Sequence, residues 1–143
     1  MALKVTKVEV WAGEIQDQPG GLADVLRPVA AAGANFEFMI ARRQADKPGT
    51  GVVFVTPVRG VRVRVAARAA GLSLATNIAT LKIEGHDHPG LIQKVSQAIA
   101  DAGLTMRGLS ASAIGKKFVC FIGFDTAEAA NIAVNLIKRL GKK

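Results

Sequence analysis

The sequence predicts an α+β protein built from two tandem copies of one unit, with antiparallel sheets and helices on one face of each sheet. The main observation is a repeated peptide, because residues 17–22 (DQPGGL) return at residues 87–92 as DHPGLI. Each copy lies between a strand-like and a helix-like apolar stretch and is therefore a strand-to-helix turn. Half of the 143 residues are hydrophobic, enough for a packed core. We expect two very small domains, at residues 1–76 and 77–143.

The first copy begins with a long predicted strand. Residues 5–15 are rich in β-formers and alternate with a period of two. After the repeated turn, apolar residues recur at helical spacing up to Gly33, a residue suited to the end of a helix. Pro28 lies inside this predicted helix. It should kink the helix or end it early, because proline in a helix costs roughly 3 kcal/mol.

A hairpin, a second helix and a short strand complete the first copy. The expected elements are strands at 35–42, 51–55 and 72–76, and a helix that ends at Gly71. Thr56 and Pro57 resemble a helix N-cap followed by proline at the first helical position. Residues 61–65 alternate like a strand, but the stretch that follows them favours a helix.

The second copy repeats this order. Its expected elements are a strand at 78–84, a helix ended by Gly103, a hairpin of 105–112 and 116–124, and a last helix. Residues 125–128 (DTAE) resemble a capping box at the start of that helix. Its inner face should be Ala130, Ala133, Val134, Ile137 and Leu140. No fourth strand follows, so the sheet edge must be open, covered by the long N-terminal strand or paired with another chain.

The formal charge of +8 is spread evenly over the two copies. Residues 1–71 hold ten Lys and Arg against six Asp and Glu, and residues 72–143 hold nine against five, so each half carries +4. This distribution favours a solvated basic surface, although net charge alone does not exclude nucleic acid as a partner. The single cysteine, Cys120, lies in an apolar run and is expected to be a small core residue.

The repeated unit resembles the ACT domain, a ferredoxin-like βαββαβ fold. The resemblance rests on Asp-x-Pro-Gly at the first turn of each copy, and on Gly-x-Asn and Gly-x-Thr at residues 33–35 and 103–105. It covers nearly the whole chain and includes no catalytic domain. It implies a non-catalytic regulatory protein without a cofactor. Such a protein binds an amino acid or similar small ligand at the interface between ACT domains, and assembles as a homodimer.

The resemblance also implies where the ligand binds. The residues carried over are Asp17, Gln18, Pro19, Gly20, Gly21, Leu22 and Asn35 in the first copy, and Asp87, His88, Pro89, Gly90, Leu91 and Thr105 in the second. Thr105 departs from the asparagine usual in the family, so the first site is the better candidate.

The chemistry of the turns agrees with this placement. Unpaired N–H groups at a helix N-terminus suit a carboxylate, and glycine lets a ligand approach the backbone. A carboxylate such as that of Asp17 can accept from an α-ammonium group. The alternative is that Asp17 and Asp87 only cap the two helices and the Pro-Gly pairs only form turns.

Other functional classes have weaker support. His86, Asp87 and His88 could be metal ligands, but the sequence has no further His, and its single cysteine, Cys120, is expected in the core rather than in a metal shell. No nucleophile elbow, phosphate-binding loop or paired catalytic carboxylates are present, which disfavours an enzyme. A structural or interaction module with a vestigial ligand site stays open.

An RNA-binding protein of the same topology is the main rival. Such domains stack bases on aromatic residues of the sheet, and residues 118–124 contain three phenylalanines. Because these are three positions apart, Phe121 should face away from Phe118 and Phe124. The neighbouring strand, residues 78–84, has no aromatic residue. No apolar run approaches the roughly 18 residues of a membrane span, and no signal peptide is evident, so we expect a cytoplasmic protein.

Overall fold

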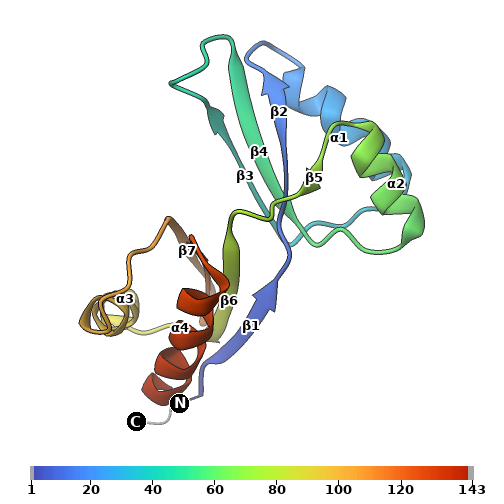
Figure 1. Cartoon of the computed structure of the whole chain (residues 1–143). Helices are drawn as coiled ribbons and strands as arrows, with labels where there is room; N and C mark the ends of the chain where they lie inside the picture. The colour runs from blue at the N-terminus through green and yellow to red at the C-terminus, as the bar shows by residue number, and fades with distance from the viewer. Residues whose placement is uncertain (1, 142–143) are drawn as a thin grey trace. The chain divides into compact units, whose positions relative to one another are not determined.

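The structure, a computed structural model, describes residues 2–141 and divides into two compact units (Figure 1). We call residues 9–75 the first unit. The second unit combines residues 76–141 with the N-terminal residues 2–8. Each unit contains one antiparallel sheet of four strands and two helices. The predicted fold class, two βαββαβ-like repeats of α+β type, is therefore confirmed.

The first unit contains the first copy of the repeat. Its elements are β2 (Trp11–Gln16), α1 (Gly21–Ala31), β3 (Phe38–Arg43), β4 (Thr50–Thr56), α2 (Val61–Ala69) and β5 (Ser73–Leu74). The strands lie in the order β3-β4-β2-β5, so β2 and β3 run in the same direction on either side of β4. The carboxyl ends of β2 and β3 therefore lie at the same end of the sheet.

The second unit has the same topology, with one strand taken from the start of the chain. Its elements are β1 (Lys4–Val8), β6 (Ala79–His86), α3 (Leu91–Asp101), β7 (Gly108–Ile114), β8 (Lys117–Phe124) and α4 (Ala127–Leu140). The strand order is β1-β6-β8-β7. Strand β1 occupies the place that β5 has in the first unit, and thus covers the edge of β6 that the second copy leaves unpaired.

The single strand expected at residues 5–15 is wrong, because the chain divides it between the two sheets. Strand β1 ends at Val8 and β2 begins at Trp11. Val10 and Trp11 are both buried, so the alternation of faces breaks at this point. Residues 4–8 pair with β6 in the second unit. The first domain was expected from sequence to span residues 1–76, which would have included them.

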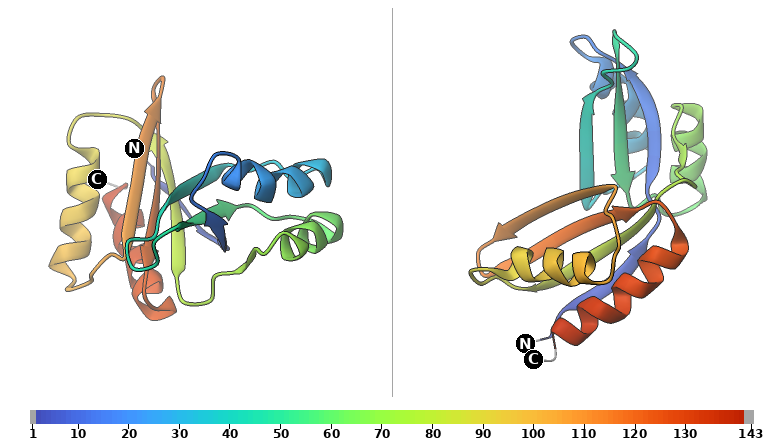
Figure 2. Two further views of the ribbon diagram at one scale, coloured as in Figure 1. Left: turned by 90° about the horizontal axis from the view of Figure 1, so that it is seen from above. Right: turned by 60° about the vertical axis from the view of Figure 1, so that its left-hand side comes forward.

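Each unit has its own hydrophobic core between the sheet and its two helices (Figure 2). In the second unit, the core residues of β8 are Phe118, Cys120, Ile122 and Phe124, which all lie on one face of the strand. Helix α3 contributes Leu91, Val95 and Ile99, and α4 contributes Ala130, Ala133 and Ile137. Val134 and Leu140 pack against this core, so the inner face predicted for α4 is confirmed.

Helix α1 does not end at Pro28. It continues to Ala31, and Gly33 follows with a φ of 99°. Proline removes the hydrogen bond to the carbonyl four residues earlier, which belongs to Asp24. Both Asp24 and Pro28 are exposed, so water can hydrate that carbonyl and the helix can pass through the proline.

The caps predicted for two helices are wrong. Thr56 is the last residue of β4, and its hydroxyl donates to the carbonyl of Glu9 at 2.8 Å, while α2 begins only after Gly60. In α4 the N-cap is Thr126, whose Oγ1 accepts from the Ala129 amide at 3.1 Å. The third helical position is thus occupied by alanine, and no reciprocal glutamate completes a capping box.

Among the described residues, no helix is both long and apolar enough to cross a membrane.

Candidate functional site

The two repeated turns have nearly the same backbone. Gly20 and Gly90 precede α1 and α3 with φ values of 84° and 83°, a conformation that favours glycine. Neither helix has a side-chain cap. The interpretation of Asp17 and Asp87 as helix caps is therefore wrong. The first amide of each helix is bonded within the turn, that of Gly21 to the Gln18 carbonyl at 3.0 Å and that of Leu91 to the His88 carbonyl at 3.3 Å. The amides of the next two residues in each helix can therefore face a ligand or water.

The residue after each of these glycines differs between the copies for a steric reason. A Cβ atom on Gly21 would lie 2.0 Å from the carbonyl oxygen of Gln16, so no side chain fits there. The equivalent residue of the second copy is Leu91, which is buried in the core of its unit. The first turn is thus folded more tightly against the end of its strand than the second.

Asp17 is held by contacts at both its backbone and its side chain. Its amide donates to the carbonyl of Gly49 at 3.0 Å, which joins the turn to the hairpin between β3 and β4. Its Oδ2 atom lies 2.8 Å from Nε of Arg43, at the end of β3. The Arg43 side chain is 83% exposed, so this ion pair should contribute under about 1 kcal/mol to stability.

Arg43 was not expected from sequence. It lies one residue beyond the predicted limit of its strand, and a lone arginine in a basic chain has no distinctive pattern. The signal that could have identified Arg43 is the topology of the unit. In a βαββαβ unit the first two strands are parallel, so a charged residue at the end of the second lies near the turn that follows the first.

A second ion pair closes the same end of the first unit. Lys47, in the hairpin turn, lies with its Nζ 2.8 Å from Oε2 of Glu14 on β2. The hydrogen bond from Lys47 lowers the pKa of Glu14, and the same contact raises the pKa of Lys47. The hairpin is therefore tied to β2 on one side and to the repeated turn on the other.

The structure does not bring Asp17 and Asn35 together within one unit. The Asp17 amide bonds to Gly49, just before β4, whereas the Glu37 amide bonds to Thr56, the last residue of β4. A strand of seven residues is about 20 Å long. Asn35, which precedes Glu37, therefore lies at the opposite end of the sheet.

The second unit repeats this separation. The Asp87 amide donates to the carbonyl of Lys116, just before β8, and the Arg107 amide donates to Gly123, near the end of β8. Thr105 lies two residues before Arg107 and thus far from Asp87. One unit alone cannot place both members of either pair against one small ligand.

A pocket of about 220 Å³ lies beside the second turn. His86, His88 and Lys94 contribute polar groups to it, and Leu91 contributes apolar surface. His86, Asp87 and His88 are the metal ligands that the sequence offers. Among the described residues, no group of three or more potential ligands is close enough to hold a metal ion.

The phenylalanines of β8 are buried. The exposed fractions of Phe118, Phe121 and Phe124 are 5%, 7% and 0%. Phe121 lies outside the core cluster that contains the other two, as its position in the strand predicts. None of the three presents the exposed ring on which an RNA base could stack. Cys120 is also buried, as expected, and burial raises the pKa of its thiol to about 12.

No family model matches the sequence, and no curated protein matches it either. Solved structures do resemble the fold. The regulatory subunit of aspartate kinase from Thermus thermophilus has a TM-score of 0.66 and 19% identity, covering 100% of this chain and 98% of that one. Protein BT0572 from Bacteroides thetaiotaomicron has a TM-score of 0.78 and 12% identity, covering 95% and 90%.

A larger protein contains a segment with a similar fold. Aspartate kinase from Clostridium acetobutylicum, described as an allosteric enzyme, has a TM-score of 0.63 and 15% identity, covering 97% of this chain and 34% of its own. These similarities show the fold: the chain shares the two-unit fold of the aspartate kinase regulatory subunit, in agreement with the fold expected from its resemblance to the ACT domain.

Proposed function

We propose that this chain is a non-catalytic regulatory protein that binds an amino acid at a site completed where ACT-like units of two copies of the chain meet. The observation that carries the proposal is the ion pair between Asp17 and Arg43 at the start of α1. The similarity to regulatory subunits of aspartate kinase supports a regulatory role over a catalytic one.

The groups around the first turn match the charges of an amino acid. The carboxylate of Asp17 can accept from an α-ammonium group. The guanidinium of Arg43 and the uncapped amides of α1 can donate to an α-carboxylate. An incoming ligand would replace the Asp17–Arg43 contact with two contacts of its own. Because that ion pair is largely exposed, separating it costs little.

A homodimer could bring Asn35 of one copy close to Asp17 of the other. Asn35 can reach a ligand at the first turn only if it comes from a second copy of the chain. Strand β3 is an edge strand of its sheet, and its Met39 and Ile40 side chains are 38% and 40% exposed. An exposed edge with apolar side chains is suited to pairing with another copy.

Ligand binding at such an interface can transmit a signal. A ligand that contacts two units binds better to one arrangement of them than to others, and thereby increases the population of that arrangement. The regulated partner would respond to this change. The proposed setting is the cytoplasm, where a buried lone thiol such as that of Cys120 remains reduced.

The proposal can be tested with a thermal unfolding screen of the twenty amino acids. A ligand at a hundred times its dissociation constant should add about 2.7 kcal/mol and raise the midpoint by several degrees. The amide and the N-acetyl derivative of the best amino acid each lack one charge and should lose most of the effect. If no amino acid at about 10 mM changes the midpoint, the proposal is rejected.

The dimer needs its own measurement. Sedimentation equilibrium should give a mass near twice that of the 14.9 kDa chain, and a ligand should strengthen the association. A monomer at all concentrations, with or without the ligand, would contradict the proposed completion of the site.

A further inference from the structure

The pocket beside the second turn belongs entirely to the second unit. It lies between the start of α3, the end of α4 and the segment that precedes β1. Its volume of about 220 Å³ is enough for a small organic molecule but below the range of about 300–1,000 Å³ typical for drug-sized ligands. Unlike the first turn, it requires no second copy of the chain to be complete.

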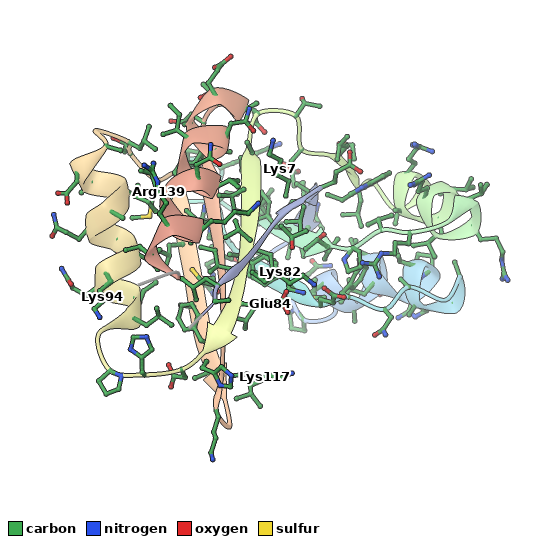
Figure 3. The ribbon with its side chains drawn as sticks, turned by 90° about the horizontal axis from the view of Figure 1, so that it is seen from below. Lys7, Lys82, Glu84, Lys94, Lys117 and Arg139 are labelled. Atoms are coloured by element: carbon green, nitrogen blue, oxygen red, sulfur yellow. The ribbon has the colours of Figure 1, made fainter. Side chains whose placement is uncertain are left out.

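Two kinds of side chain line this pocket. Leu3, Leu91 and Leu140 provide apolar surface from three separate segments. His86, His88 and Lys94 provide groups that are cationic or can become so. Figure 3 shows Lys94 on the first part of α3, the helix end nearest to the turn. Among the residues that the structure describes, no acidic one lines the pocket.

The acidic residues close to this pocket in the sequence do not add negative charge to its lining. Glu84 lies 3.6 Å from Lys82 on the same strand, and the two are neighbours on β6 in Figure 3. Asp87 is exposed, and its backbone amide is bonded to Lys116. Lys117 lies opposite His86 in the register of β6 and β8, but it does not line the pocket. The charge facing the pocket is therefore positive.

His88 has a defined orientation. Its Nδ1 atom lies 3.1 Å from the carbonyl oxygen of Pro89. Because a carbonyl can only accept, Nδ1 carries the hydrogen and Nε2 is the remaining ring nitrogen. Neutral His88 offers an acceptor at Nε2, and protonated His88 offers a donor.

We infer that this pocket is a second small-molecule site, which takes a small carboxylate with a short branched aliphatic body and no ammonium group. The carboxylate contacts Lys94 and the histidines, and the aliphatic body packs against the three leucines. This site is independent of the proposed amino acid site, since it uses one unit and lacks a pair such as Asp17 with Arg43.

Gly85 does not line the pocket itself, but it gives Leu3 the room to do so. A Cβ atom at this position would lie 2.6 Å from Cδ2 of Leu3. The absence of a side chain thus lets Leu3 lie where it lines the pocket. The start of the chain therefore has two roles in the second unit, since β1 completes its sheet and Leu3 contributes to its pocket.

The inference can be tested with 4-methylpentanoate as the probe. In NMR titrations of the full chain at pH 6, leucine methyl signals from Leu3, Leu91 and Leu140 should shift together and saturate. The neutral 4-methylpentanamide should bind at least about tenfold more weakly, and so should inorganic phosphate. Equal binding of the amide, or no binding at about 10 mM acid, would overturn the inference.

Variants separate this site from general electrostatic attraction. Lys94→Gln and His88→Gln should each weaken binding of 4-methylpentanoate by about fivefold or more. Lys138→Gln removes the same charge from α4 at a residue that does not line the pocket and should have no effect. Equal losses in Lys94→Gln and Lys138→Gln would refute a specific site. Asp17→Asn should leave this binding unchanged, so the amino acid site can fail without affecting the result.

Discussion

Asp17 reaches past β4 to form an ion pair with Arg43, with 2.8 Å between Oδ2 and Nε, although β2 and β3 are not hydrogen-bonded to each other. The pair brings both charges needed to recognise an amino acid to one end of the first unit. It lies beside the uncapped start of α1, where backbone donors are also free for a ligand.

The substitution Asp17→Asn should remove the thermal shift caused by an amino acid ligand. The amide cannot balance the charge of an ammonium group, whereas its shape is nearly unchanged. Without ligand the stability should change by less than about 1 kcal/mol, because the ion pair is exposed. Both quantities come from thermal unfolding with and without the amino acid.

Asp24→Asn is the matched control for that experiment. It breaks another exposed ion pair of the same unit, between Asp24 and Arg27, at 3.2 Å and within α1. Its ligand-induced shift should match that of the unmodified protein. An equal loss in both variants would indicate a general effect of charge and would contradict a role for Asp17 in binding.

Strand β1 should be essential to the second unit rather than to the first. Val5 lies opposite Ile83 and packs against the core of the second unit, whereas its neighbour Thr6 is exposed. Val5→Asp places a charge at the edge of this core and should lower the unfolding free energy by about 1–3 kcal/mol. Urea unfolding measured by circular dichroism gives this value.

Thr6→Asp introduces the same residue on the opposite face of β1 and should cost less than about 0.5 kcal/mol. Hydrogen exchange adds the location of the effect. In Val5→Asp, amides of β6 and β8 should exchange faster, while those of β2 and β4 should not. Faster exchange in the first unit alone would show that β1 does not stabilise the sheet assigned to it.

Most elements of the fold were predictable because each has a local signal. The repeated turns, Gly33, Gly103 and the hairpin glycines mark where elements end, and the two copies support each other. The division of residues 5–15 between two sheets was not predictable, because every residue there is compatible with a strand. Only the unpaired edge of β6, a feature distant in sequence, decides which sheet Lys4–Val8 joins.

The candidate site was predictable in part, for a similar reason. Repetition identified the turn that contains Asp17. The contact with Arg43 depends on the order of strands in space, and the opposite position of Asn35 depends on the direction of β4. The capping box failed for a local reason. Two adjacent residues, Asp125 and Thr126, could each serve as N-cap, and sequence alone does not decide between them.

The two glycines of the first turn should respond differently to substitution by alanine. Gly21→Ala places a Cβ atom 2.0 Å from the Gln16 carbonyl oxygen, so the turn must move. Gly20→Ala has free space around its Cβ but keeps a φ of 84°, a strain of about 1–2 kcal/mol. Urea unfolding should therefore show the larger loss in Gly21→Ala, by at least about 1 kcal/mol.

The same comparison tests the ligand site. Gly21→Ala should weaken amino acid binding because it displaces the amides at the start of α1. Gly90→Ala in the second turn has the same backbone strain as Gly20→Ala, with φ of 83°, and should leave binding at the first turn unchanged. If Gly21→Ala were as stable as the unmodified protein, the close packing of this turn would be refuted.

The buried thiol of Cys120 should make the second unit less stable in alkali. Burial raises its pKa from 9.0 to about 12 in the folded chain. Above pH 9 the unfolded chain therefore loses a proton that the folded chain retains, and the unfolding free energy falls as pH rises. Between pH 9 and pH 10 the loss from this group should be about 1 kcal/mol.

Cys120→Ala isolates this contribution. Its stability at pH 7 should be lower than that of the unmodified protein, because a small cavity forms, but its unfolding free energy should fall less between pH 9 and pH 10. The Lys47–Glu14 pair also weakens in alkali, because its contribution is lost as pH rises from the ordinary lysine pKa of 10.5 through the raised pKa of Lys47, so the comparison stays below pH 10.5. Equal pH slopes in both proteins would mean that the thiol ionises in the folded state. It should then also react rapidly with thiol reagents in native buffer, whereas a buried thiol reacts only as fast as the second unit opens.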